Sequence, residues 1–472
     1  METLPPEVYS QILSLARPTR PKRTPRHILP LEITLSHVSS GWRSLALSDS
    51  KSWELVEIFS PKTLPRGAAY VERSAGAAIY VRIDIYDYEY NHGLVRPRGH
   101  EALVAGLEEV LRTAAPRCKT LLILTYYAQT AERLAAALDN IEAPLLQRLR
   151  INTTVHDVDL QSPREDGRTL GTAAPATEES DIAKKIHFPI FSGGVSSLYF
   201  AELEVPFFPP LSGLVTLHIH NTRLTWLTFD TFAQIISQAS SLENLSISPG
   251  YYTSAHWPVH RDAPRITLPS LRALRIDDDE SPGMSWRILL SLATPNLISL
   301  SLLSTSTGFN TLFEAPQIQA SIGARWPKLE YLVLHENNLQ EMTGWAKMFP
   351  TIKYLHLPRL MGYYFKRFAR DILLPTATGE SLWPELRVLV FGTAKDQYSK
   401  TVQDGLCSIA TERKARGLPV PKIMGDREFI ASMKTSDLVN EVTETEVVDV
   451  NNYREPWWVM NHEETMDKIG LA

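Results

Sequence analysis

LVTLHIH, residues 214–220, has apolar side chains at Leu214, Leu217 and Ile219, separated by three positions and then by two. Because successive side chains of a β-strand point to opposite faces, Leu217 and Ile219 share one face, and Leu214 turns towards the same side where the strand begins. A strand of this length cannot bury its apolar face alone. The stretch therefore needs neighbouring strands of the same kind, and their presence elsewhere in the chain decides the fold.

The pattern apolar-x-x-apolar-x-apolar recurs along most of the chain. It begins at ten positions, which are Cys118, Leu146, Val195, Leu214, Leu242, Leu271, Leu297, Leu329, Ile352 and Leu386. From Leu214 onward the starts are 28, 29, 26, 32, 23 and 34 residues apart, which brackets the period of leucine-rich repeats. Strict alternation at Ile79, Val81, Ile83 and Ile85 predicts one more strand ahead of the series.

Amphipathic segments separate these strands. Apolar residues at helical spacing occur at 101–116, 228–241, 285–293 and 343–350. Short strands that alternate with helices stack into a continuous parallel sheet that carries the helices on one side. We therefore predict an α/β fold in which residues 59–425 form an irregular leucine-rich-repeat solenoid, with a parallel sheet on its concave face.

Two stretches depart from the array. Residues 152–185 are rich in polar and small side chains, which predicts a flexible insertion. Beyond about Pro421 the pattern stops, and residues 426–472 are predicted to be a C-terminal cap or tail. We favour a cap over the open end of the array, because the adjacent Trp457 and Trp458 are costly to expose to water.

The N-terminal region follows a helical pattern instead. A first helix is expected from Pro6 to about Ala16, since proline suits the first helical position. Its apolar residues form two adjacent ridges, namely Val8, Ile12 and Leu15, and Tyr9, Leu13 and Ala16. This apolar surface is wider than a single core contact needs.

Two shorter helices are expected between residues 31 and 47. Apolar residues lie four, three, four and three positions apart at Leu31, Leu35, Val38, Trp42 and Leu45, and Ser39-Ser40-Gly41 interrupts the pattern with a turn. A unit of about 50 residues with helices this short buries too little surface to be stable alone. It therefore needs another surface to pack against.

Together these residues carry a resemblance. Leu4-Pro5-x-Glu7, Ile12-Leu13, Val38, Trp42-Arg43, Leu45-Ala46 and Trp53 resemble the F-box over about residues 3–58. The resemblance implies that residues 1–58 form a helical domain that binds a Skp-type adaptor, and through it a cullin-RING ubiquitin ligase. The adaptor-binding positions that it implies are Leu4, Pro5, Ile12, Leu13, Leu35, Val38, Trp42 and Leu45.

An F-box followed by leucine-rich repeats resembles the two-part build of substrate-recognition adaptors in protein degradation. On the predicted concave face, the side chains between the buried ones are candidates for binding a target protein. The informative ones are His218, His220, Arg275, Asp277, Tyr331, His335, Tyr354 and His356.

Two other functions of the chain stay open, and one segment has more than one interpretation. The N-terminal helices could merely cap the array, which would make the chain a leucine-rich-repeat interaction scaffold outside any ligase. An active site without a known motif could make it an enzyme, although the sequence has no GxGxxG, P-loop, HExxH or CxxC.

Residues 17–26 interleave five basic residues with three prolines, which fits a bridging loop, a nuclear-localisation signal or a site for a polyanion.

Composition narrows the classes of function. A formal net charge of -5 argues against a dedicated nucleic-acid binder. Two cysteines are too few for a disulfide framework or a thiolate metal site, and Cys118 occupies an inward position that suits a buried thiol. We expect no secretory signal, no membrane span and no cofactor, and a cytoplasmic or nuclear location.

Overall fold

The computed structural model describes most of the two regions in which the sequence predicts elements. The described residues are 5, 8, 11, 15, 31–91, 97–155, 188–203, 207–220, 229–248, 257, 266–277, 284–302, 325–334, 339–358, 368–374, 381–391, 400–425, 427, 429–430 and 444–447. They divide into two compact units, unit 1 within Met1–His220 and unit 2 within Asn221–Trp458. The sequence pattern does not predict this division.

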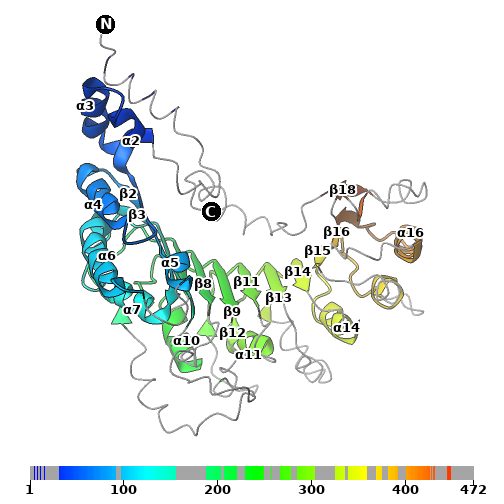
Figure 1. Ribbon diagram of the computed structural model, residues 1–472. Coiled ribbons are helices and arrows are strands. Elements are labelled where there is room, and N and C mark those ends of the chain that lie inside the picture. The colour runs from blue at the N-terminus through cyan, green and yellow to red at the C-terminus, as the bar shows by residue number, and fades with distance from the viewer. Residues whose placement is uncertain are drawn as a thin grey trace, which may run out of the picture. The chain divides into compact units, whose positions relative to one another are not determined.

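The fold is mixed α/β, as predicted, with ten helices and a parallel sheet of fourteen strands among the described residues. Strand order in the sheet follows chain order (Figure 1). Unit 1 contributes β1 (Leu55–Ile58), β2 (Ile79–Asp84), β3 (Cys118–Tyr127), β4 (Arg148–Val155), β6 (Phe200–Leu203) and β8 (Thr216–His220). Unit 2 contributes β9 (Asn244–Ser248), β11 (Ala273–Ile276), β13 (Ser299–Leu302), β14 (Tyr331–Leu334), β15 (Tyr354–Leu357), β16 (Val388–Phe391), β17 (Lys422–Gly425) and β18 (Thr445–Val447).

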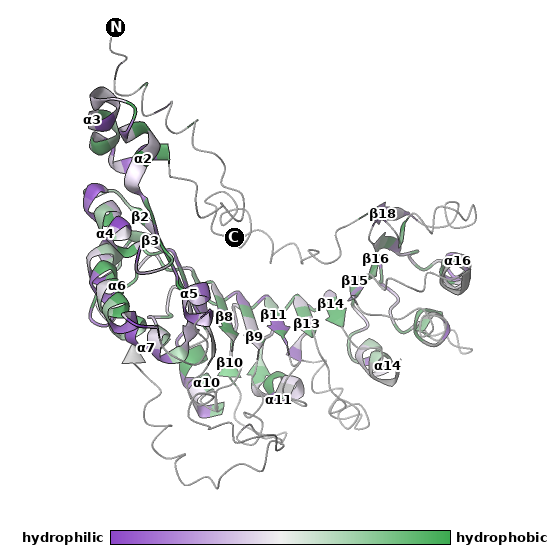
Figure 2. Cartoon of the chain, viewed as in Figure 1, coloured by the Kyte–Doolittle hydropathy of each residue, from purple (hydrophilic) through white to green (hydrophobic). Residues whose placement is uncertain are grey.

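In unit 1, the strands align their apolar residues into continuous rows. One row joins Val56, Val81, Leu121, Leu149, Ala201 and Leu217, and the next joins Ile58, Ile83, Ile123, Ile151, Leu203 and Ile219. All twelve side chains are buried. Helices α4 (Leu64–Arg73), α6 (His100–Ala114) and α7 (Ala128–Ala136) cover this side of the sheet (Figure 1), and α6 carries both hydrophobic and hydrophilic residues (Figure 2).

Unit 2 repeats the arrangement. Its first row consists of Leu245, Leu274, Leu300, Leu332, Leu355, Leu389 and Ile423, and all of these side chains are buried. Helices α10 (Phe229–Ser237), α11 (Met284–Ser291) and α14 (Leu339–Met348) lie along one side of these strands (Figure 1). Helix α16 (Lys400–Ala415) follows β16, and the π-helical turn η6 spans Ala369–Leu373. Short strands complete both units, namely β5 (Phe188–Pro189) with β7 (Phe207–Phe208) and β10 (Ile266–Thr267) with β12 (Leu292–Ala293).

A backbone turn that recurs along the chain positions the first apolar residue of the apolar-x-x-apolar-x-apolar pattern. The N–H of Leu214 donates to the carbonyl of Leu211 over 3.0 Å, and the N–H of Leu297 donates to Thr294 over the same distance. Equivalent bonds occur at Leu146, Leu198, Leu242, Leu271, Leu329, Ile352 and Leu386. The residue three positions earlier is buried in every case. The repeat therefore contains one more inward position than the sequence pattern indicates.

One repeat is assigned wrongly by the sequence pattern. The pattern starts at Val195 and places Leu198 and Phe200 on the core side of the strand. In the structure, Ala201 pairs with Leu149 and Leu203 with Ile151, so the repeat begins at Leu198 and Phe200 faces the opposite side. Phe200 and Ala201 are both apolar, and because the side-chain period of a strand is two residues, only the neighbouring strand decides the register.

The array also extends beyond both predicted ends. Residues 55–58, assigned to the helical domain, form β1 and pair with β2. Strand β17 lies within the predicted range of residues 59–425, and β18 adds one more strand beyond it. Gly425 takes a core position in β17, where the Phe429 ring fills the space that a side chain would occupy. Because this position is a glycine, the apolar-x-x-apolar-x-apolar pattern does not identify β17. Residues 152–155 of the predicted insertion belong to β4. The rest of the insertion lies outside the described residues, and so do Trp457 and Trp458 of the C-terminal region.

A buried arginine joins α16 to the turns around it. The Arg413 side chain is fully buried, and its Nε donates to the carbonyl of Pro419 over 2.7 Å. Its Nη2 donates to Trp383 over 3.0 Å and to Pro384 over 3.2 Å. Burial lowers the pKa of Arg413 to about 10, so the guanidinium stays protonated at neutral pH. The charge is offset by the dipoles of these carbonyls, which accept its hydrogen bonds.

Replacing Arg413 should therefore destabilise unit 2. Arg413→Met keeps much of the apolar volume but removes the hydrogen bonds to the carbonyls of Trp383, Pro384 and Pro419, and we expect a loss of about 2–4 kcal/mol in the free energy of unfolding. Urea unfolding followed by circular dichroism measures it. Arg416→Met is the matched control, because Arg416 is partly exposed and pairs with Glu412 at the same helix end. Equal midpoints for the two variants would contradict the structural role of Arg413.

Candidate functional site

Two short helices near the N-terminus form the first candidate site. Helix α2 spans Leu31–Ser36 and α3 spans Ser40–Ser48, as the spacing of apolar residues predicts. Between them the Ser39 hydroxyl accepts a hydrogen bond from the Trp42 N–H over 3.2 Å. Serine is a favoured residue at this N-terminal capping position. The Ser39-Ser40-Gly41 break in the sequence therefore marks the start of α3.

The two helices are joined to the rest of unit 1 through one tryptophan. Trp53, at the end of the 3₁₀ helix η1 (Ser50–Trp53), is buried, and its indole N–H donates to the Ala46 carbonyl of α3 over 2.8 Å. Its ring meets the Tyr70 ring of α4 edge-on at 4.9 Å. The Tyr70 hydroxyl donates to Glu32 of α2 over 2.5 Å. Both helices thus attach to α4 along the side that carries Glu32 and Ala46.

Their other surfaces keep apolar side chains in contact with solvent. Val38 is 63% exposed and Leu47 is 44% exposed, while Leu35, Trp42 and Leu45 are partly exposed. Earlier in the chain, Leu15 is 81% exposed. Of the other predicted adaptor-binding residues, Pro5 is exposed, and Leu4, Ile12 and Leu13 lie outside the described residues. Unit 1 therefore leaves this apolar surface uncovered at the positions that can be described.

The predicted target-binding residues belong to both units of the structure. In unit 1, His218 of β8 is buried and its ring lies 5.1 Å from the Phe200 ring. In unit 2, the Tyr331 and Tyr354 rings stack at 4.0 Å on adjacent strands, beside the buried His356. Arg275 lies in β11, and Asp277 directly follows the last residue of that strand, Ile276. The side chain of His220, and all of His335, lie outside the described residues.

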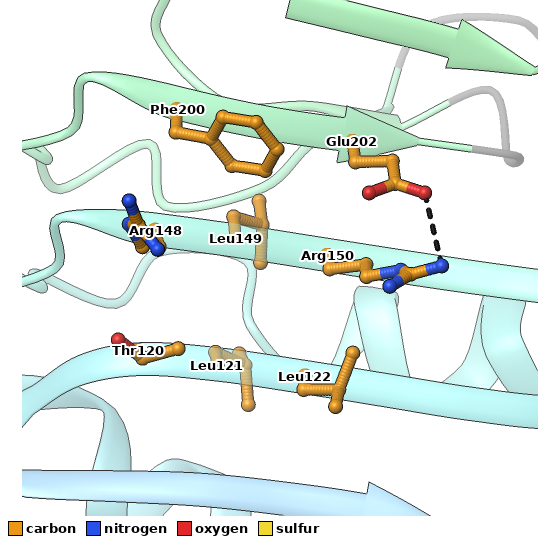
Figure 3. Close-up of a pocket in the computed structure, with 8 residues that line it drawn as sticks. All are labelled: Thr120, Leu121, Leu122, Arg148, Leu149, Arg150, Phe200 and Glu202. Carbon is orange, nitrogen blue, oxygen red and sulfur yellow. Dashed lines mark ion pairs between the residues drawn. The ribbon is translucent and has the colours of Figure 1, made fainter. Parts of the chain in front are cut away.

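A hollow that the sequence analysis missed lies on unit 1. It measures about 290 Å³, including the space open to solvent, and lies over β3, β4 and β6 (Figure 3). Its lining residues are Thr120, Leu121, Leu122, Arg148, Leu149, Arg150, Phe200 and Glu202. The signal that could have found it is RLRIN at 148–152, where two arginines alternate with core residues and so share the face opposite the helices.

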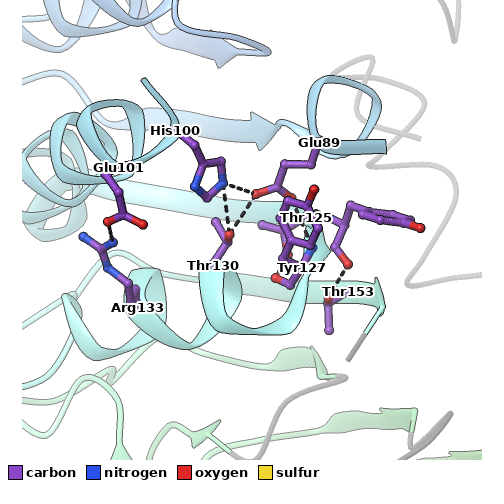
Figure 4. Close-up of polar contacts among 9 residues, drawn as sticks. Glu89, His100, Glu101, Thr125, Tyr127, Thr130, Arg133 and Thr153 are labelled. Atoms are coloured by element: carbon purple, nitrogen blue, oxygen red, sulfur yellow. Dashed lines mark hydrogen bonds and ion pairs between the residues drawn. The ribbon is translucent and has the colours of Figure 1, made fainter. Parts of the chain in front are cut away.

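A buried polar cluster lies where α5 (Tyr86–Tyr90), α6 and α7 meet the end of β3. The fully buried Glu89 carboxylate accepts from the N–H of Tyr126 over 2.6 Å and from the Thr130 hydroxyl over 2.8 Å. His100 Nε2 lies 2.7 Å from the same carboxylate (Figure 4). The Glu101 carboxylate pairs with Arg133 beside the cluster. Because Glu89, His100 and Thr130 are all buried, no substrate can reach them, and the cluster joins three helices to one strand.

The described residues contain no group of three or more His, Cys, Asp or Glu side chains that could hold a metal ion. Cys118 is buried as the sequence predicts. Burial raises the pKa of the Cys118 thiol to about 12, which keeps it protonated. Burial, followed by the charge of Asp404, also raises the pKa of Cys407, although that side chain is only half-buried.

Comparisons with known proteins give no assignment. No protein-family model matches the chain, and no curated protein matches it. None of the helices in the described part of the chain is long and apolar enough to cross a membrane. The geometry of the two candidate surfaces is therefore the basis for any functional proposal.

The two thiols should react very differently in the folded protein. At pH 8 a thiol with a pKa near 12 is ionised in roughly one molecule in ten thousand, and only the thiolate attacks a disulfide reagent. We expect titration with an aromatic disulfide to detect Cys407 alone in the native chain and both cysteines in denaturant. Rapid reaction of two thiols before unfolding would contradict the burial of Cys118.

Removal of Glu89 should destabilise unit 1. Glu89→Ala leaves the Tyr127 N–H and the Thr130 hydroxyl buried without this acceptor, and we expect a loss of about 3 kcal/mol or more in the free energy of unfolding. Thermal and urea unfolding measure it. The matched control is Glu109→Ala on the exposed side of α6, which should change stability by less than about 0.5 kcal/mol. A similar small change for Glu89→Ala would show that the cluster contributes little.

Proposed function

We propose that this protein is a non-catalytic substrate-recognition subunit of a Skp-cullin-F-box ubiquitin ligase. In this proposal, the N-terminal helices bind a Skp-type adaptor, and an irregular leucine-rich-repeat solenoid presents a target protein. Ubiquitin transfer would then be accelerated by proximity, because other subunits supply the chemistry and this chain holds the target near them.

The observation that carries the proposal is the apolar surface of α2 and α3. Val38, in the turn between α2 and α3, and Leu47 of α3 are exposed, while the two helices are fixed on their other side through Ala46 and Glu32. When one side of a helix is anchored to its own domain and the other side is exposed, the apolar side chains on the exposed side are held in place and suit the central part of a protein interface. Residues 31–53 also match the order and spacing of the F-box resemblance.

A second proposal, a leucine-rich-repeat interaction scaffold without a ligase, is favoured by the same anchoring contacts. Trp53 and Tyr70 hold α2 and α3 against α4, as expected if the helices merely cap the first strands of the array. The two proposals differ in one respect. A cap needs only the anchored side of the helices, whereas an adaptor-binding domain also needs the exposed side.

Substitution on the exposed side separates the two. Val38→Glu places a charge on a turn residue that is 63% exposed, so the chain should fold normally. Burying a valine side chain in an interface contributes about 1.5–3 kcal/mol, and we expect capture by a Skp-type adaptor to fall at least tenfold. A pull-down of the full chain with purified adaptor, titrated over adaptor concentration, measures this.

Leu145→Glu is the matched control, since Leu145 is a turn residue of unit 1 that is 42% exposed. It should bind the adaptor as the unaltered chain does. Capture of all three chains alike would remove the support from α2 and α3, and absence of capture for the unaltered chain would favour the scaffold.

A further inference from the structure

Strand β18 is the last strand of the sheet among the described residues (Figure 1). It pairs in parallel with β17 on one side, where the Ile423 N–H donates to the Glu444 carbonyl over 2.8 Å. The backbone groups of successive strand residues point to alternate sides. The N–H and C=O groups of Thr445 and Val447 therefore point away from β17. We call this row of backbone groups, with the side chains of β18, the β18 edge.

The side chains of the β18 edge are exposed on both sides of the sheet. Val447 is 48% exposed and pairs with Gly425, the core position that the Phe429 ring fills. Glu446 is also exposed and points to the opposite side, since side chains alternate along a strand. A row of outward backbone donors and acceptors beside an exposed apolar side chain is suited to the addition of an extended polypeptide as a further strand.

The side of β18 that carries Glu446 is negatively charged. The Lys422 ammonium of β17 lies 2.7 Å from Glu444 Oε1 and 2.7 Å from Glu446 Oε2. The side chains of these two glutamates are 72% and 48% exposed. In the sequence, residues 441–449 (EVTETEVVD) contain four acidic residues and no basic one. One ammonium balances only one of the two carboxylates, so the β18 edge retains negative charge.

These features define the strand that the β18 edge would accept. A basic side chain beside Glu446 gains an opposite-charge cross-strand pair, and an apolar side chain beside Val447 covers its exposed surface. Because the two sides alternate along a strand, the complementary sequence alternates basic and apolar residues.

Two other occupants fit less well. A second copy of β18, added with its helices on the same side of the sheet, would place glutamate beside glutamate, and like charges on neighbouring strands are destabilising. The basic segment 17–26 of this chain contains three prolines, which cannot donate to a strand ladder. The charge and the backbone together therefore favour a separate polypeptide.

We propose that the β18 edge binds a partner polypeptide as an added strand in which lysine or arginine alternates with apolar residues. The partner backbone pairs with Thr445 and Val447. Its basic side chains pair with Glu446 and Glu444, and its apolar side chains cover Val447. This inference goes beyond the proposed function, because binding at the β18 edge requires neither an adaptor nor the helices α2 and α3.

Labelled peptides with the sequence Lys-Val-Lys-Val-Lys-Val test the inference on the unaltered full chain by fluorescence anisotropy. One peptide is unmodified, one is N-methylated on the lysines, and one is N-methylated on the valines. In an added strand, alternate N–H groups face β18 and the others face solvent, so methylation of one set should abolish binding and methylation of the other should change the affinity by less than about twofold. No binding of the unmodified peptide, or equal binding of all three, would overturn the inference.

Two substitutions locate the binding on β18. Val447→Pro removes an N–H that points away from β17, and proline is tolerated at such edge positions, so we expect the sheet to persist and peptide affinity to fall at least about tenfold. Glu446→Gln removes one cross-strand charge pair and should weaken binding about threefold. Glu412→Gln is the matched control, because Glu412 is an exposed glutamate of α16 that also lies in an ion pair, with Arg416. It should leave the affinity unchanged.

Equal peptide affinities for Val447→Pro and the unaltered chain would overturn the site. Size-exclusion chromatography gives a further check, since an unaltered dimer that becomes monomeric in Val447→Pro would show a second copy at the β18 edge and would also overturn the inference. A chain that binds the peptide but captures no adaptor would contradict the ligase proposal alone. A chain that captures the adaptor but does not bind the peptide would contradict the β18 edge alone.

Discussion

The fold depends on apolar residues that lie in register on adjacent parallel strands. Each strand of unit 2 presents only two core residues, such as Leu274 and Ile276 of β11, and two side chains cannot exclude water by themselves. Pairing places Leu274 between Leu245 and Leu300, so every strand is buried by its neighbours. The backbone turn that brings Leu297 to the carbonyl of Thr294 adds a third inward residue at each step. Stability therefore comes from repetition of the unit along the chain, and the lengths of the segments between strands can vary.

The same constraint explains the position of the N-terminal helices. Because β1 begins at Leu55, the helices reach the array within a few residues, and Trp53 fills the space between α3 and α4. This contact uses only one side of α2 and α3. The exposed Val38 then stays on a surface that unit 1 holds in place, which is why adaptor binding is the function that we propose for it.

Polar groups buried inside the array fix the positions of its helices. Glu89 accepts hydrogen bonds from the backbone of β3 and from Thr130 of α7, and Arg413 donates to the carbonyls of Trp383 and Pro419. Each buried charge is held by several hydrogen bonds, and so it orients the elements around it instead of serving as a reactive group. Arg150 of β4 differs, since its buried Nε has no hydrogen-bond partner among the described residues.

The sequence by itself determined the class of fold, the strands of most repeats, the helices α2 and α3, and the burial of Cys118, because these depend on local periodicity. It could not determine the register at Phe200, the strand that ends at Gly425, or the network around Glu89. Those features depend on which residue of a distant segment lies alongside, as Leu149 does for Ala201 and the Phe429 ring does for Gly425. The hollow at Arg150 was likewise decided by tertiary structure, because its floor and its rim come from three strands that meet only when the sheet has formed.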